Sequence, residues 1–164
     1  EVMTDKVQLN LGCWKDIRPD FVNIDIQDFP GVNRVLDATK LAEFADNSVD
    51  FIVAQHLLEY IPRKQMLPAL SEWHRVLKQG CPLEIRVTDL ATMTRSLYLN
   101  SVSDEMGIHH EMVIALLYGK QKDTFDIRYN GFTSDFLQGV LTGIGYTVIN
   151  VVSEEHDVII TALK

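Results

Sequence analysis

The last two apolar runs of the chain constrain its fold more than any other feature. Residues 146–152 (YTVINVV) and 157–163 (DVIITAL) are rich in β-branched side chains, which is typical of strands. Only the polar segment SEEH lies between them, and it is too short to contain a crossover helix. The two strands must therefore pair antiparallel and end the chain as a hairpin.

Upstream of this hairpin, short apolar runs alternate with helical patterns. This alternation indicates an α/β fold, with a mostly parallel twisted sheet and helices on both faces. The connections 12–20 and 27–32 are shorter than the ~10–12 residues that a crossover with its helix requires, so we expect both to be loops. The predicted strands are 7–11, 21–25, 33–36, 50–54 and 82–87, and the predicted helices are 67–78, 91–99, 104–118 and 134–142.

Helix-end signals support these boundaries. Ser103 and Thr133 are suited to cap the last two helices, and Gly119 follows the end of the first of these. Pro68 fits the helix 67–78 only within its first turn, because proline has no amide hydrogen to donate.

Length, charge and cysteine content limit the function classes. We expect one domain, residues 1–164, with 91–130 as a helical insertion. A net charge of −8 disfavours broad nucleic-acid binding, which depends on clustered cations. No apolar run is long enough to span a membrane and no export signal is evident, so we expect a cytoplasmic protein. Cys13 and Cys81 are expected to be free thiols at opposite ends of the sheet.

Polar residues and a glycine follow five consecutive predicted strands. The carboxyl ends of parallel strands share one rim, and ligands of open α/β sheets bind beyond that rim. We therefore expect these residues to form one site. They are Gly12 after the first strand, Asp25 at the end of the second, Asp37 after the third, Gln55 and His56 after the fourth, and Asp89 after the fifth.

These residue types suit a nucleoside ligand. Gly12 would let the ligand approach the backbone, and Asp25 could accept hydrogen bonds from both ribose hydroxyls. Asp37 could accept from the exocyclic amine of adenine, while the small Ala38 leaves room for the ring. An acid at a strand end also commonly opens a turn or caps a helix, so a purely structural role stays open for each one.

The chain resembles the class I S-adenosylmethionine-dependent methyltransferases, most closely a small type-11-like branch found among sugar and cell-surface biosynthesis enzymes. The resemblance covers most of residues 7–90 and the closing hairpin. It implies a Rossmann-like fold in which an antiparallel last strand is inserted into a parallel sheet. It rests on the segments LNLGC, FVNIDI, DAT, DNSVDFIVAQHLLEYI, EWHRVLKQGCPLEIRVTDL and HDVIITALK, in this order.

By this resemblance the cofactor is S-adenosylmethionine. The resemblance also implies a role for each residue of the rim. The cofactor turn would be formed by Asn10, Gly12 and Cys13, the ribose would meet Asp25 followed by Ile26, the adenine edge would meet Asp37 and Ala38, and the methionine portion would lie between Gln55 and His56.

Three segments depart from the family pattern. The cofactor turn usually reads GCG and here reads GCW, LEH reads LEY, and KPGG reads KQGC. The indole of Trp14 could stack on the adenine or block its place. It could also pack against the loop 15–20, which is the arrangement that we favour. These departures leave open a degenerate methyltransferase fold that binds a partner without catalysis.

The expected activity is methyl transfer to an oxygen or nitrogen of a small-molecule acceptor, with a sugar or surface-polymer precursor as the class that the resemblance implies. Such transfer needs alignment of the nucleophile, the methyl carbon and the sulfur, and a nearby base can remove the acceptor's proton. Asp89 is the first candidate for this base, although it could also cap a helix, and His56 is the second.

Other ligand classes fit the sequence less well. A nicotinamide dinucleotide site is disfavoured because the chain has no G-x-G-x-x-G turn. A nucleic-acid methyltransferase is disfavoured by the negative charge. We expect no metal, since His109 and His110 are adjacent on a helix and would point about 100° apart. The sequence predicts no oligomeric state.

Overall fold

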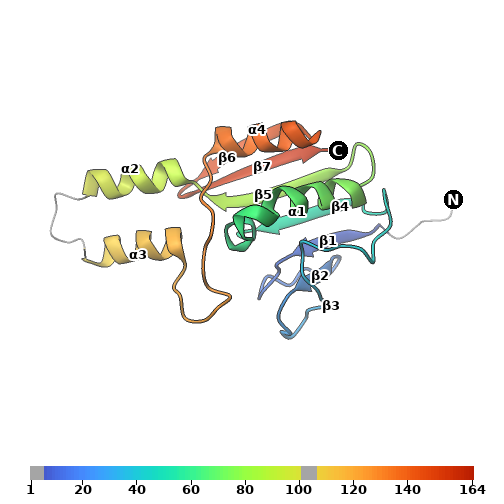
Figure 1. The fold of residues 1–164 in the computed structure, drawn as a ribbon, viewed down its shortest axis with the longest axis horizontal. Coiled ribbons are helices and arrows are strands. Elements are labelled where there is room, and N and C mark those ends of the chain that lie inside the picture. Colours follow the sequence, from blue (N-terminus) through green and yellow to red (C-terminus); the bar gives the residue numbers. More distant parts are fainter. Residues whose placement is uncertain (1–5, 101–106) are drawn as a thin grey trace.

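The computed structural model describes residues 6–100 and 107–164, without the side chains of residues 97, 99, 100 and 107–110. The predicted cap Ser103 and the side chains of His109 and His110 therefore lie outside the described residues. The described strands form one seven-stranded sheet in the order β3-β2-β1-β4-β5-β7-β6 (Figure 1). The strands are β1 (Gln8–Leu11), β2 (Val22–Asp25), β3 (Arg34–Val35), β4 (Phe51–Gln55), β5 (Pro82–Thr88), β6 (Thr147–Glu154) and β7 (Asp157–Leu163).

The sheet has the predicted mixture of parallel and antiparallel pairs. Strands β1 to β5 pair parallel with one another, and β7 pairs antiparallel with both β5 and β6. The closing hairpin and the inserted antiparallel strand are thus confirmed. The strand order reverses between β1 and β4, which is where open α/β sheets bind ligands.

The first two crossovers contain no helix, as their lengths predicted. Buried side-chain amides hold the first of these loops on the sheet. Asn10 Nδ2 donates to the Asp16 carbonyl oxygen at 2.6 Å and to Asn23 Oδ1 at 3.0 Å. Asn23 Nδ2 donates to the Arg18 carbonyl oxygen at 2.9 Å. Side-chain hydrogen bonds from β1 and β2 thus hold this loop in place, although it contains no helix that could pack on the sheet.

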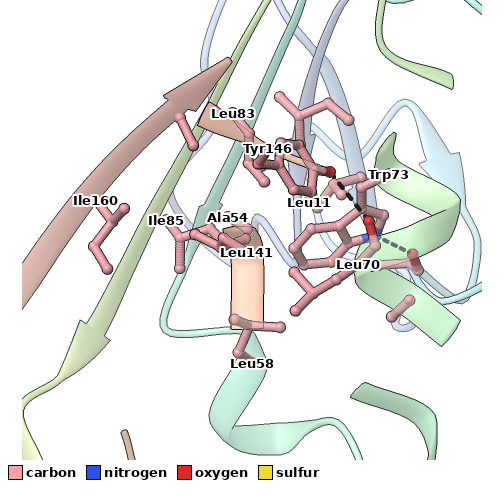
Figure 2. Packing of buried hydrophobic residues seen from close by; sticks show 14 of the residues in the cluster. Leu11, Ala54, Leu58, Leu70, Trp73, Leu83, Ile85, Leu141, Tyr146 and Ile160 are labelled. Atoms are coloured by element: carbon pink, nitrogen blue, oxygen red, sulfur yellow. Dashed lines mark hydrogen bonds between the residues drawn. The ribbon is translucent and has the colours of Figure 1, made fainter. Parts of the chain in front are cut away.

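The core lies between the sheet and the helices α1 (Arg63–Val76) and α4 (Ser134–Ile144). Trp73 and Tyr146 are buried there, and each polar group has a partner, as buried aromatic residues require (Figure 2). Trp73 Nε1 donates to the Ala38 carbonyl oxygen at 2.8 Å, and the Tyr146 hydroxyl donates to the Leu70 carbonyl oxygen at 3.1 Å. These bonds join α1 to the segment after β3 and to the start of β6.

Helix α1 begins one turn earlier than predicted, so the expectation for Pro68 is wrong. Pro68 is the sixth residue of the helix and cannot donate to the Lys64 carbonyl. The structure tolerates it because both residues are exposed, which leaves that carbonyl accessible to water.

Two further helices, α2 (Leu90–Asn100) and α3 (Gly107–Tyr118), lie side by side beyond the carboxyl end of β5 (Figure 1). Gly119 follows α3 with a φ of +79°, and Thr133 Oγ1 caps α4 by accepting from the Phe136 amide. Both helix-end predictions are confirmed.

Candidate functional site

The strand registers bring the predicted polar residues to one rim. Leu11 pairs with both Ile24 and Ala54, so the residues that follow β1, β2 and β4 are neighbours. Gln55 pairs with Arg86, and Thr88 pairs with Asp157 at the start of β7. The rim therefore runs from Asp25 through Gly12 and His56 to Thr88 and Asp157.

Gly12 and Asp25 form a tight turn at one end of this rim. Gly12 has a φ of +62°, and a Cβ atom there would lie 2.7 Å from Leu57 Cδ1, so any other residue would be strained at this position. Asp25 is 8% exposed; its Oδ2 accepts from the Trp14 amide at 2.8 Å and its Oδ1 from the Gln27 amide at 3.0 Å. Each carboxylate oxygen keeps a second lone pair for a ligand.

The indole of Trp14 does not pack into the loop 15–20 as we expected. It is 58% exposed, and its only described ring contact with this loop is with Nζ of Lys15, the first loop residue, 5.0 Å from the ring centroid. The loop needs no aromatic filler because Asn10 and Asn23 already hold it through hydrogen bonds. Its backbone amide, rather than its ring, contacts Asp25.

The remaining cofactor candidates differ in exposure. Ile26 is exposed directly beside Asp25, whereas Ala38 is buried. Asp37 is half-buried; its Oδ1 accepts from the Thr39 amide and hydroxyl at 2.9 and 2.7 Å. Its Oδ2 has no partner among the described residues.

Cys13 lies beneath the turn rather than on its surface. The side chain is 2% exposed, and burial, aided by the charge of Asp25, raises its pKa to about 11. A thiol in this state is a poor nucleophile. Cys13 and Cys81 are both free thiols, as predicted.

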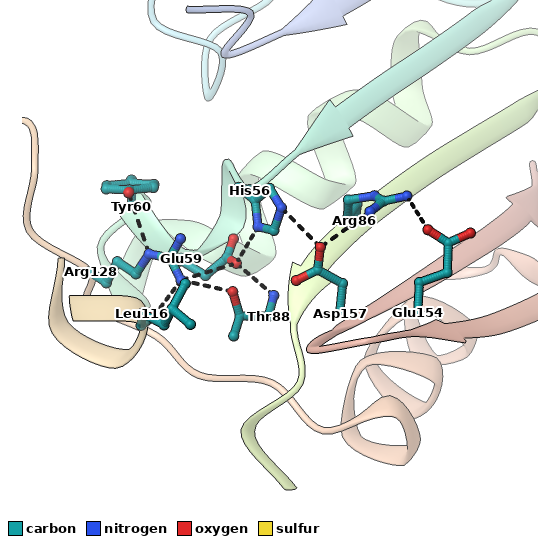
Figure 3. A network of polar contacts seen from close by, with 9 residues as sticks. All are labelled: His56, Glu59, Tyr60, Arg86, Thr88, Leu116, Arg128, Glu154 and Asp157. Atoms are coloured by element: carbon teal, nitrogen blue, oxygen red, sulfur yellow. Dashed lines mark hydrogen bonds and ion pairs between the residues drawn. The ribbon is translucent and has the colours of Figure 1, made fainter. Parts of the chain in front are cut away.

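His56 lies at the centre of the rim, next to the half-buried Gln55. Its Nδ1 is 3.4 Å from Glu59 Oε1, and its Nε2 is 3.2 Å from Asp157 Oδ2 (Figure 3). The imidazole thus faces a carboxylate on each side.

A cleft of about 550 Å³ lies beside His56. Its walls come from β4, β5, the β6–β7 turn, α3 and the segment after α3. The charged and polar residues that line it include His56, Arg86, Arg128, Glu155, His156 and Asp157.

A buried ion pair supports one wall of this cleft, and the sequence interpretation missed it. Glu59 is buried in a 3-10 helix, η1 (Leu58–Tyr60), and its Oε1 accepts from the Thr88 amide at 2.9 Å. Arg128 Nη1 lies 3.9 Å from that oxygen and donates to Thr88 Oγ1 at 2.8 Å (Figure 3). A charged residue inside the LEY segment was the only sequence signal; nothing in the sequence links it to Arg128.

Arg86 and Asp157 were also missed. Arg86 Nη1 donates to Asp157 Oδ2 at 3.2 Å, and its Nη2 donates to Glu154 Oε2 at 2.7 Å. The sequence did indicate that Arg86 is unusual, because it is a charged residue within the apolar run 82–87. The partners of Arg86, however, depend on the register between β5 and β7.

The carboxylate of Asp89 caps α2. Its Oδ2 accepts from the Thr92 amide at 3.1 Å and from the Thr92 hydroxyl at 2.6 Å, and its Oδ1 accepts from the Ala91 amide at 3.3 Å. The helix-capping role that we considered for Asp89 is therefore observed.

Backbone strain gathers on the rim. Five non-glycine residues of the described chain have a positive φ, and three of these are Trp14, His56 and Glu155 at +41°, +50° and +49°. Such conformations cost about 1–3 kcal/mol each and are concentrated at functional sites.

Neither a metal site nor a membrane-crossing helix is found in the described part of the chain. No group of three or more histidine, cysteine or acidic side chains could hold an ion among the residues searched. None of the described helices combines the length and apolar character that crossing a bilayer requires.

Comparison with known proteins identifies the fold. Residues 14–84 match the model of a family described as "Methyltransferase domain", whereas none of the curated proteins is similar in sequence. A SAM-dependent methyltransferase from Methanosarcina mazei is 21% identical, with a TM-score of 0.68 over 99% of this chain and 94% of that chain. A SAM-dependent methyltransferase from Archaeoglobus fulgidus is 14% identical, with a TM-score of 0.62 over 97% of this chain and 86% of that chain.

A third similar structure contains ligands. It is 1,6-didemethyltoxoflavin-N1-methyltransferase from Burkholderia thailandensis, with bound 1,6-didemethyltoxoflavin and S-adenosylhomocysteine. It is 15% identical, with a TM-score of 0.67 over 96% of this chain and 70% of that chain. These comparisons confirm the Rossmann-like methyltransferase fold and the family resemblance predicted from the sequence.

Proposed function

We propose that this chain, which has the fold of the class I S-adenosylmethionine-dependent methyltransferases, transfers a methyl group from S-adenosylmethionine to an oxygen or nitrogen of a small-molecule acceptor. One observation carries the proposal. The Gly12–Asp25 turn and the cleft occupy adjacent parts of one rim, with His56 between them. A cofactor on the turn and an acceptor in the cleft would meet at His56.

The residues of the turn fit the cofactor. Asp25 has free lone pairs for the ribose hydroxyls, and the exposed Ile26 offers an apolar surface for the adenine ring. Asp37 Oδ2 has no described partner and could accept from the exocyclic amine. Asn10 supports the turn from below instead of facing the ligand, since its amide is bonded to the loop. The bound cofactor would supply an electrophilic methyl group on a positively charged sulfur.

The cleft would orient the acceptor and take its proton. Methyl transfer depends mainly on alignment, which the walls of a cleft can provide. We assign the proton to the pair formed by His56 and Asp157, whose facing atoms are 3.2 Å apart. Asp89 would act by fixing the start of α2. Leu116 of α3 lines the cleft, which supports the acceptor-side role proposed for residues 91–130.

A degenerate, non-catalytic fold is the alternative. The main argument for it was Trp14 in the place of a turn glycine. The indole is exposed rather than buried in the turn, and this weakens that argument.

Calorimetric titration with S-adenosylmethionine, S-adenosylhomocysteine and NAD tests the proposal. We expect the first two ligands to bind and NAD not to bind. Asp25→Ala should weaken S-adenosylhomocysteine binding about 30-fold or more, because it removes two charge-assisted hydrogen bonds to the ribose.

The matched control is Asp28→Ala, which removes an exposed acid from the same loop and should leave the affinity unchanged. Thermal unfolding of both variants checks that the turn still folds. If neither S-adenosylmethionine nor S-adenosylhomocysteine binds at millimolar concentration, the chain is the non-catalytic alternative.

A further inference from the structure

Unsatisfied polar atoms gather at the cleft. Three buried side-chain atoms of the described chain lack a hydrogen-bond partner: Glu59 Oε2, Arg86 Nε and His156 Nδ1. Arg86 and His156 line the cleft, and Glu59 contacts the lining residue His56. Buried polar atoms in folded proteins almost always have partners, so these three atoms mark the cleft and the wall behind it as an unusually polar region.

The cations of the cleft are already neutralised. Arg86 contacts both Glu154 and Asp157, at 2.7 and 3.2 Å. The side chain of Arg128 is 8% exposed, and its guanidinium faces the buried Glu59. Neither group has a charge left over for a phosphate or a carboxylate on the acceptor.

The anions of the cleft are in excess. Counting Glu59 behind the wall, four carboxylates surround the cleft against two guanidinium groups, alongside the imidazoles of His56 and His156. Glu155 has no partner among the described residues, and the left-handed backbone at this residue holds it at the tip of the β6–β7 turn. A cleft with this balance attracts cations and repels anions.

We infer that the acceptor is a small amine, bound as its ammonium form between Glu155 and the His56–Asp157 pair, and that the nitrogen of this amine is methylated. This inference rests on the proposed function and specifies the acceptor for the same site.

The proposed reaction is balanced by the groups at hand. The ammonium loses one proton to the His56–Asp157 pair, which frees the nitrogen lone pair. That lone pair forms a bond to the methyl carbon as the methyl–sulfur bond breaks, and the electrons of that bond remain on sulfur. The products are a methylated ammonium ion and neutral S-adenosylhomocysteine, and the site returns its proton to solvent.

Probes of similar size that differ in the charge of their functional groups test this inference. The first series is glucosamine, glucose, glucuronate and glucose 6-phosphate, and the second is 1,4-diaminobutane, 1,4-butanediol and succinate. Binding of each probe to the full chain is measured by calorimetry with S-adenosylhomocysteine present in excess. Transfer of a radiolabelled methyl group from S-adenosylmethionine is measured in parallel. In at least one series we expect the amine to bind about 10-fold more tightly than the alcohol, and the acids not to bind.

Substitution of Glu155 identifies the residue responsible. Glu155→Gln should reduce the preference for the amine over the alcohol about 5-fold without changing S-adenosylhomocysteine affinity, because one charge is removed outside the cofactor turn. Asp20→Asn is the control. It removes an exposed acid before β2, at the opposite end of the sheet, and should change neither quantity.

The outcomes separate this inference from the proposed function. An acid that binds as tightly as its amine, or no amine preference while S-adenosylhomocysteine binds, overturns the inference alone. An amine preference that survives Glu155→Gln unchanged also overturns it. Failure of S-adenosylhomocysteine itself to bind defeats the proposed function.

Discussion

Cys13 shows how a position can matter more than a residue type. Its place after β1 made it part of the cofactor turn, yet the thiol points into the protein and is 2% exposed. Burial and the nearby charge of Asp25 both disfavour the thiolate, which is why its pKa rises to about 11. The Cys13 side chain is therefore not part of the surface that a ligand would touch.

The reactivity of the two thiols should therefore differ. At pH 8, roughly one Cys13 in a thousand is ionised, so a chromogenic disulfide reagent should modify one thiol per folded chain, that of the half-exposed Cys81. The second thiol should react only after unfolding. Cys13→Ser should keep the fast reaction and Cys81→Ser should lose it; two fast thiols in the native chain would contradict the burial of Cys13.

Helix α1 carries an interior proline that its packing does not need. Pro68 removes one hydrogen bond from the second turn, yet its side chain is exposed and contributes nothing to the core. The helix forms because its other face buries Met66, Ala69, Leu70, Trp73 and Val76. Tertiary packing outweighs a local penalty here, and this is why the helix start was predicted a turn too late.

Replacing that proline should stabilise the protein. Pro68→Ala restores the hydrogen bond to the Lys64 carbonyl, and we expect it to raise the free energy of unfolding by about 1–3 kcal/mol in urea denaturation. Gln65→Ala, at another exposed position of α1, should change it by less than about 0.5 kcal/mol. If Pro68→Ala leaves the free energy of unfolding unchanged or lowers it, the amide of the alanine does not form the expected hydrogen bond to the Lys64 carbonyl.

At the scale of the whole molecule, the buried pair of Glu59 and Arg128 joins parts of the chain that are distant in sequence. Glu59 belongs to η1. Its carboxylate contacts Thr88 at the end of β5 and His56 directly after β4. Arg128 adds the Tyr60 hydroxyl at 3.3 Å and the carbonyl of Leu116 at the end of α3. The pair therefore ties α3 and the segment behind it to the sheet.

Breaking this pair should be costly because it leaves a buried charge without a partner. Arg128→Met should lower the free energy of unfolding by about 3 kcal/mol. The double variant with Glu59→Gln should lose less than the sum of the single variants. The control is Arg34→Met. Its pair with Glu43 has the same separation of 3.9 Å but is exposed, so it should lose less than about 1 kcal/mol. Equal losses in Arg128→Met and Arg34→Met would mean that burial does not strengthen the pair.

Local patterns in the sequence were enough to predict much of this molecule. The seven strands, the antiparallel end and the helix-free crossovers follow from hydrophobic period and connection length, which are properties of short segments. The same reasoning brought Gly12, Asp25, Asp37 and His56 to one rim, because the ends of parallel strands must share it. Turn and cap signals at Gly119 and Thr133 are equally local, and the structure confirms both.

Only the tertiary structure decided the chemistry around that rim. Side-chain burial separates Cys13, which points inward, from Trp14, whose ring is exposed, although the two residues are adjacent. The partners of His56 and Arg86 depend on the register of β7 against β5, and the wall of the cleft depends on a contact between Glu59 and Arg128 across 68 intervening residues. Such contacts are set by how the whole chain packs. The sequence determined which residues share the rim, and the packed structure decided which charges surround it.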